Sequence, residues 1–156
     1  MRSAINVRLM GLDVGEKRIG VSLSDPQGLL AQSLTVIQRT SLKRDIQIIG
    51  KLAKENDVAK IVVGLPRQMD GSIGPQALKT EAFARELERR LRLPIILWDE
   101  RLTTVAAERL MIEAGVRRER RKEKIDAVAA TLLLQGYLDF LHSEASRPGE
   151  VSPYED

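Results

Sequence analysis

The chain has 156 residues, a length typical of a single domain that can bury a hydrophobic core. It has no cysteine and a single histidine, His142, so disulfides, thiolate zinc sites and cysteine nucleophiles are excluded, and neither a histidine-rich metal site nor Ser-His-Asp catalysis is expected. The formal net charge of +3 is a mild bias, and the sequence shows neither the apolar h-region of a signal peptide nor a stretch apolar enough to span a membrane, which predicts a cytoplasmic protein without a membrane partner.

The first part of the chain predicts three strands. Residues 7–14 and 18–24 alternate between apolar and polar and are joined by a turn that contains Gly15, as in a hairpin. Residues 32–38 follow as a third strand. An acid, Asp13, stands in the otherwise apolar first strand, where an unpaired buried charge would be costly, so it must be satisfied by a turn or bind a cation.

Two helices and two further strands are expected next. Thr40 or Ser41 caps a helix. Its predicted apolar stripe consists of Leu42, Ile46, Ile49 and Ala53. Residues 60–66 predict a short buried strand, and Pro75 can occupy the first position of a helix that ends near Leu91. Residues 93–100 predict another buried strand.

The last third of the chain is expected to be helical. Thr103 or Thr104 caps a helix that ends at Gly115, and a basic loop follows it. The final helix carries the clearest apolar stripe, formed by Ile125, Val128, Ala129, Leu132, Leu133, Gly136, Tyr137, Phe140 and Leu141. Residues 146–156 are polar and proline-rich and are expected to be disordered, which leaves one domain over residues 1–145. The order β-β-β-α-β-α-β-α-α indicates a mixed sheet with helices on its faces.

Three separated groups of acids are candidates for a metal site. Asp13 lies in the first strand, Asp99 and Glu100 end the last strand, and Asp126 lies in the first turn of the last helix. Each could instead cap a turn or answer a helix dipole. Together, in a chain without cysteine, they suit a hard cation bound by oxygen, and Mg²⁺ or Mn²⁺ in such a site activates water for phosphodiester hydrolysis.

Basic residues could position the phosphates of a nucleic acid. The run RRERRKEK, residues 117–124, has six basic and two acidic residues. Such a run is most often a solvated surface, but it can also follow a phosphate backbone. The candidate nucleic-acid-binding residues are Lys17, Arg18, Arg67, Arg101, Arg117, Arg118, Arg120, Arg121 and Lys122. A solvated turn is an equally good interpretation of Lys17 and Arg18, and the MDGS segment near Arg67 is also an ordinary turn sequence.

Four segments, in this order, resemble the YqgF (RuvX) family over about residues 9–139: GLDVGEKRIGVSLSD, IVVGLPRQMDGS, WDERLTT and KEKIDAVAATLLLQGYLD. Members of this family are described as Holliday-junction resolvases or as pre-16S ribosomal RNA nucleases. The resemblance implies a ribonuclease H-like α/β fold, with a five-stranded mixed sheet of order 3-2-1-4-5 in which strand two is antiparallel to the rest. It also implies that Asp13 is the first-strand metal ligand and that the last helix brings Asp126 beside it.

The resemblance makes the Asp99–Glu100 pair the source of the second acid, although related junction resolvases carry that acid at the end of the fourth strand, which here reads VVGLP. Two strand spacings are roughly 9.5 Å, which favours the longer Glu100 side chain. Adjacent strand residues face opposite sides, so only one of the pair is expected in the site, with Asp99 as the alternative. Glu123 could be an outer ligand three residues before Asp126, but a surface role is the preferred interpretation.

The function implied by the resemblance is that of a metal-dependent endonuclease on structured RNA or branched DNA. Two Mg²⁺ or Mn²⁺ ions would be held by Asp13, Glu100 and Asp126, and the products would carry a 5′-phosphate and a 3′-hydroxyl. The protein could be a monomer or a homodimer. The alternatives are a non-catalytic RNA-binding assembly factor and an actin-like ATPase or sugar-kinase lobe, although the latter needs a second lobe for which this chain has no room.

Overall fold

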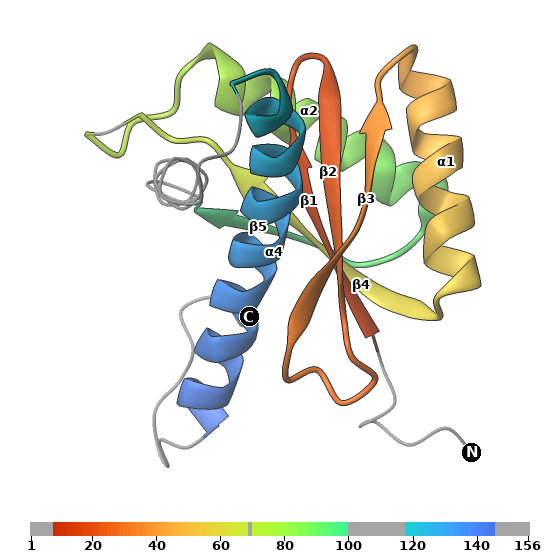
Figure 1. The fold of residues 1–156 in the computed structure, drawn as a ribbon, viewed down its shortest axis with the longest axis vertical. Coiled ribbons are helices and arrows are strands. Elements are labelled where there is room, and N and C mark those ends of the chain that lie inside the picture. Colours follow the sequence, from red (N-terminus) through yellow and green to blue (C-terminus); the bar gives the residue numbers. More distant parts are fainter. Residues whose placement is uncertain (1–7, 69, 100–117, 146–156) are drawn as a thin grey trace.

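The computed structural model describes residues 8–68, 70–99 and 118–145, and within the last helix the side chains of residues 127–143 (Figure 1). The elements in chain order are β1 (Arg8–Val14), β2 (Arg18–Ser24), β3 (Ala31–Gln38), α1 (Leu42–Glu55), β4 (Val58–Leu65), α2 (Pro75–Leu91), β5 (Ile95–Asp99) and α4 (Arg118–Ala145). The helix predicted to end at Gly115 and the tail predicted for residues 146–156 lie outside the described residues. No helix in the described ranges is long and apolar enough to cross a membrane.

The five strands form one mixed sheet in the order β3-β2-β1-β4-β5. β2 is antiparallel to both β1 and β3, whereas β1, β4 and β5 run parallel. The turn between β1 and β2 is tight, since the N–H of Gly15 donates to the carbonyl of Arg18 at 2.8 Å. The predicted order 3-2-1-4-5 is therefore confirmed, with β1 in the centre.

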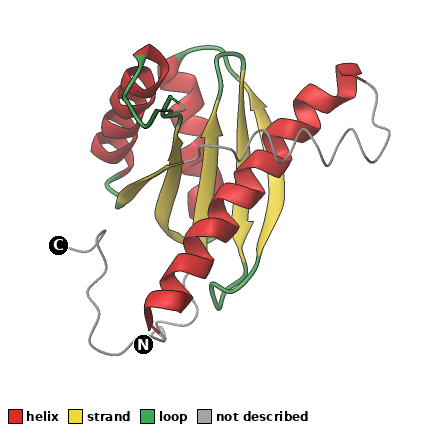
Figure 2. Cartoon of the chain, turned by 90° about the vertical axis from the view of Figure 1, so that its left-hand side faces the viewer, coloured by secondary structure: helices red, strands yellow, loops and turns green. Residues whose placement is uncertain are grey.

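Helices cover both faces of the sheet. α1 and α2 lie on one face and α4 lies on the other (Figure 2). β1 alternates between the two layers, because Met10, Leu12 and Val14 join the core under α1 and α2. Leu9 instead packs with the α4 residues Leu133 and Leu138. This alternation decides which side chains of β1 can meet α4.

α1 differs in one respect from its prediction. Ser41 is the N-cap, and its hydroxyl accepts the N–H of Arg44 at 3.2 Å. Leu42 is 39% exposed, so its place in the predicted stripe was wrong. Asp45 is buried in its stead, because its carboxylate is bound by the N–H of Thr40 and by Arg39.

The last helix begins earlier than predicted. α4 starts at Arg118, so the prediction of a basic loop over residues 118–124 was wrong. Arginine, lysine and glutamate are good helix formers, which accounts for the extension. Asp126 consequently lies in the third turn of α4 rather than the first, and the helix dipole does not explain it.

The buried face of α4 is also wider than the predicted stripe. Leu132 is 36% exposed, whereas Ala130, Leu134 and Leu138 are fully buried. α4 contacts four neighbouring strands, β3, β2, β1 and β4. A helix lying across so broad a surface buries two adjacent rows of side chains.

β5 was predicted to be buried, but all five of its residues are half-buried. It is the edge strand beside β4, and a strand at that position has a neighbour on one side only.

α4 lies very close to β1 at Gly11, which predicts a large effect of Gly11→Ala. A Cβ atom there would lie 2.8 Å from Leu134 Cβ and 3.1 Å from the carbonyl oxygen of Ala130. The buried Ser22 hydroxyl holds that carbonyl at 2.6 Å, so the helix cannot easily retreat. We expect Gly11→Ala to lower the free energy of unfolding by about 1–3 kcal/mol, as overpacking does.

Urea titration followed by circular dichroism measures this change. Gly136→Ala in α4 is the matched control, because its Cβ would have an ordinary contact 3.6 Å from Trp98 Nε1. That variant should be neutral or stabilised by up to about 1 kcal/mol, since alanine favours a helix. Equal effects of the two substitutions would contradict the tight contact at Gly11.

Candidate active site

Asp13 is the penultimate residue of the central strand. It pairs with Gly20 of β2 and is half-buried, so its carboxylate can meet both solvent and protein. Gly11, two residues earlier, faces α4, because an added Cβ would touch Leu134. Strand residues two apart share a face, and Asp13 therefore faces the α4 side of the sheet.

The parallel strands bring several predicted residues to the same edge of the sheet. Leu12 of β1 pairs with Val63 of β4, which in turn pairs with Leu97 of β5. The carboxyl ends of β1, β4 and β5 consequently meet at one edge. Asp13 and Asp99 both lie at this edge, and Arg67 follows β4 there.

α4 runs antiparallel to β1. Gly11 lies against Ala130 and Leu134, while Leu9, at the other end of β1, packs near Leu138. Asp126 is one helical turn before Ala130, about 6 Å along the axis, and Asp13 is two strand residues beyond Gly11, about 6.7 Å. The α4 backbone at Asp126 is thus level with Asp13. Figure 1 shows that α4 runs down the sheet against the direction of β1. The side chain of Asp126 lies outside the described part of the chain, so its pairing with Asp13 stays a prediction.

Trp98 indicates which face of the sheet Asp99, the last residue of β5, takes. Its ring packs against Tyr137 and Phe140 of α4, with ring centroids 5.4 Å apart in each case. Trp98 therefore faces α4, and Asp99, the next residue of the strand, faces the opposite side. Glu100 lies outside the described residues. The alternation disfavours Asp99 as a partner of Asp13.

The basic candidates are only partly described. Lys17 is exposed in the β1–β2 turn, Arg18 is half-buried at the start of β2, and Arg67 is exposed after β4. The segment after Arg67 is an ordinary turn, in which the Asp70 carboxylate accepts the N–H of Ser72 at 2.9 Å. Arg118, Arg120, Arg121 and Lys122 lie in the first two turns of α4, of which the backbone alone is described. Arg101 and Arg117 lie outside the described residues.

The sequence did not predict an ion pair on the far face of the sheet, the face that α1 and α2 cover and that lies opposite α4. Arg39 Nε lies 3.2 Å from Oδ2 of Asp45, whose side chain is 1% exposed. Nη1 of Arg39 donates to the carbonyl of Gly15 at 2.8 Å, and its backbone N–H donates to that of Lys17 at 2.9 Å. Arg39 thereby anchors the β1–β2 turn, which follows Asp13, from the face of the sheet covered by α1 and α2. The one feature of the sequence that could have indicated this ion pair is Asp45, an acid directly before Ile46 of the predicted apolar stripe.

A family model described as "RuvX: Holliday junction resolvase" matches residues 7–140. The chain belongs to the RuvX family. Among its curated relatives, a "Putative pre-16S rRNA nuclease" of Moorella thermoacetica is 55% identical over 86% of this chain and 96% of its own length. The protein of the same name from Syntrophomonas wolfei is 51% identical over 85% of this chain and 94% of its own. Family membership supports a nuclease function and confirms the resemblance found in the four sequence segments.

Solved structures agree on the fold. RuvC of Thermus thermophilus, in complex with a Holliday junction substrate, superposes with a TM-score of 0.53 at 15% identity and covers 87% of this chain and 96% of its own. The Fowlpox virus resolvase, in complex with Holliday junction DNA, gives 0.53 at 11% identity, over 86% of this chain and 99% of its own. At such identities the likeness concerns the fold alone, and it confirms the predicted ribonuclease H-like architecture.

Proposed function

We propose that this RuvX-family chain is a divalent-metal-dependent endonuclease that processes precursor 16S ribosomal RNA. The observation that carries the proposal is the position of Asp13, a half-buried carboxylate at the end of the central strand and on the face covered by α4. The substrate is inferred from the relatives that are about half identical over nearly their whole length. A central carboxylate beside a helix that carries a second acid suits phosphodiester hydrolysis.

Asp13, Glu100 and Asp126 would hold Mg²⁺ or Mn²⁺, two ions in all. The residues fit such ions, because the candidate ligands are all carboxylate oxygens and Asp13 is open enough to be reached. When bound, these ions supply an activated water and stabilise the leaving oxygen of a phosphodiester. The long Glu100 side chain suits a ligand that approaches from two strands away, whereas Asp99 is directed to the opposite face. Lys17, Arg18 and Arg67 surround this edge of the sheet and would orient the substrate backbone.

The start of α4 is the proposed track for substrate phosphates. We expect the replacement of Arg117, Arg118, Arg120 and Arg121 by alanine to flatten the slope of log affinity against log salt by about two to three units, since each duplex phosphate contact contributes nearly one. All sequences should be weakened alike, because phosphate contacts carry no base information. Alanine is the best helix former, so α4 should persist.

Binding titrations at several salt concentrations, with Ca²⁺ in place of the active metal, measure the slope. A matched control replaces four cations on the far face, Lys51, Lys54, Arg85 and Arg89, which are exposed on α1 and α2. The control should keep the native slope. A basic surface with no nucleic-acid partner predicts equal slopes for both quadruple variants and the native protein.

Holliday-junction resolution is the second candidate, favoured by the description of the matching family model. A junction has two-fold symmetry, so its resolution would call for a homodimer, whereas RNA processing can be performed by a monomer. The chain has two Phe, two Tyr and one Trp, so base stacking is a minor contribution and shape and phosphate contacts remain for either polymer. The lack of cysteine suits the cytoplasm, where we place the protein.

Depletion of the protein in cells separates the candidates. Accumulation of 5′-extended 16S precursors supports the proposed function. Accumulation of unresolved recombination intermediates with normal 16S ends would favour the junction instead. If the 5′-extended precursors disappear when the depleted cells express a variant that lacks the Asp13 carboxylate, the protein would be a non-catalytic assembly factor.

A further inference from the structure

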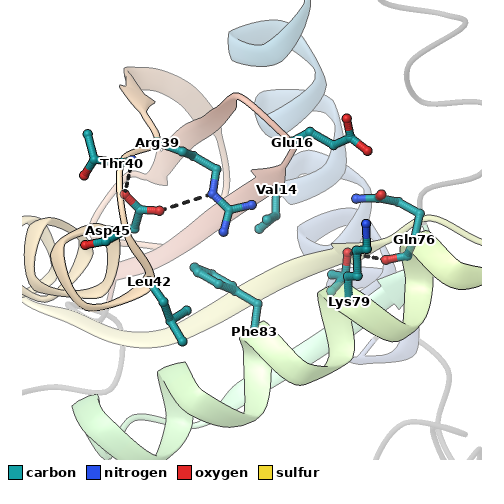
Figure 3. Close-up of a pocket in the computed structure, with 11 residues that line it drawn as sticks. Val14, Glu16, Arg39, Thr40, Leu42, Asp45, Gln76, Lys79 and Phe83 are labelled. Carbon is teal, nitrogen blue, oxygen red and sulfur yellow. Dashed lines mark hydrogen bonds and ion pairs between the residues drawn. The ribbon is translucent and has the colours of Figure 1, made fainter.

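A polar cavity of about 640 Å³ lies beside the β1–β2 turn, between that turn, the start of α1 and the first half of α2 (Figure 3). We propose that it is a second phosphate-binding subsite, which holds the nucleic-acid backbone next to the segment cleaved at Asp13. This inference rests on the proposed nuclease function. Val14 lines the cavity and follows Asp13 in the same strand, so the two sites lie on opposite faces of β1.

Nitrogen donors from two parts of the fold, the segment before α1 and the first turns of α2, converge on this cavity. Figure 3 shows the guanidinium of Arg39 on one side and the amine of Lys79 and the amide of Gln76 on the other, with Phe83 below. Arg39 uses Nε and Nη1 to bind Asp45 and Gly15, which fixes the plane of its guanidinium. Its Cζ atom lies 5.3 Å from the centroid of the Phe83 ring. A fixed guanidinium opposite a mobile amine is a suitable clamp for a phosphate group.

Of the two acids that line the cavity, Asp45 does not oppose an anionic ligand. Asp45 is fully buried, and its two oxygens are bound by Arg39 at 3.2 Å and by the N–H of Thr40 at 3.1 Å. Glu16 is exposed, and Figure 3 shows its carboxylate directed away from Arg39 and on the side of Gln76, so it is the one acid of the lining that a ligand would meet. The N-terminus of α1, capped at Ser41, adds partial positive charge at the wall. The accessible polar groups are therefore mainly donors.

Size and position favour a nucleotide of the substrate over an isolated phosphate ion. Pockets of about 300–1,000 Å³ hold organic ligands, and this one has apolar walls at Val14 and Phe83 beside its donors. The backbone N–H of Arg39 donates to the carbonyl of Lys17, so the cavity begins where the β1–β2 turn ends. An RNA strand that passes over Lys17, from the face of β1 that carries Asp13 to the opposite face, would reach Arg39 and Lys79.

Binding of a ten-nucleotide single-stranded RNA in EDTA tests the subsite without cleavage. We expect Lys79→Gln to reduce the salt slope by about 0.7, the contribution of one single-strand phosphate. Lys51→Gln, an exposed lysine of α1 that does not line the cavity, is the control and should keep the native slope. Gln76→Glu should weaken binding further by adding a negative charge. Equal slopes for the Lys79 and Lys51 variants would overturn the proposal.

Competition distinguishes the source of the phosphate. Inorganic phosphate and adenosine monophosphate should displace the RNA only at concentrations far above its Kd. Equally tight, Lys79-dependent binding of either small phosphate would overturn the assignment to a nucleic-acid backbone. The binding assay contains EDTA, so its result does not depend on metal-dependent cleavage at Asp13. Failure of the proposed subsite and failure of the proposed nuclease function are therefore detected in two separate experiments.

Discussion

Asp13→Asn should abolish cleavage while substrate binding stays nearly intact or becomes slightly tighter. Asparagine keeps the shape of the side chain at the end of β1 and removes the charge that a bound cation would require. Loss of the metal's electrostatic contribution, several kcal/mol, corresponds to a rate reduction on the order of a thousandfold. Binding is spared because the carboxylate repels the phosphates that the basic residues attract.

Single-turnover cleavage with Mn²⁺ and equilibrium binding with Ca²⁺ separate the two effects. Asp139→Asn is a matched control, because Asp139 is an exposed acid of α4 whose carboxylate accepts a hydrogen bond from Gln135 at 2.9 Å, a bond that asparagine can also accept. It should cleave at the native rate. Full activity of Asp13→Asn with Mn²⁺ would remove Asp13 from the site.

Glu100→Gln should lose at least about tenfold more activity than Asp99→Asn, because removing a metal ligand costs far more than altering a residue outside the site. The physical reason is the side of the sheet to which strand alternation is expected to assign each residue. Trp98 packs on α4 through Tyr137 and Phe140, so strand alternation turns Asp99 to the other face and would return Glu100 to the face of Asp13.

Both variants must fold for this comparison, and circular dichroism with a thermal melt checks that they do. Neither substitution changes side-chain size, so the two melts should coincide with that of the native protein. The reverse ranking of activities, with native-like spectra, would identify Asp99 as the ligand and would mean that β5 breaks its alternation at its last residue.

The elements along the chain could be predicted because each depends on a local signal, such as the alternation around Gly15, the apolar run before Pro66, and Pro75 at the start of α2. The order 3-2-1-4-5 of the strands in the sheet was implied by the family resemblance instead. One error came from a tertiary interaction and another from a local preference that was overlooked. Asp45 is buried because Arg39, six residues away, pairs with it, and no periodicity shows that. Residues 118–124 were interpreted by their charge, although their helix propensity was the better guide.

The candidate site shows the same division. Asp13 was recognisable because an acid interrupts an apolar strand. Its direction toward α4 depends on the contact of Gly11 with Leu134, which joins residues far apart in the sequence. The cavity beside Arg39 depends on the β1–β2 turn, the segment that leads into α1, and α2 together, so no single segment could indicate it. Isolated charged residues such as Lys79 acquire a meaning only from the fold.

The central claim is that this chain itself hydrolyses phosphodiester bonds with a divalent metal. The most direct test incubates the purified protein with a precursor 16S RNA fragment that carries its 5′ leader, in EDTA, Mg²⁺ or Mn²⁺, with Asp13→Asn purified in parallel. The account predicts endonucleolytic cleavage with Mg²⁺ or Mn²⁺ that leaves 5′-phosphate and 3′-hydroxyl ends, and none in EDTA or with the variant. Cleavage that persists in EDTA, or an RNA left intact by the native protein with either metal, would contradict it.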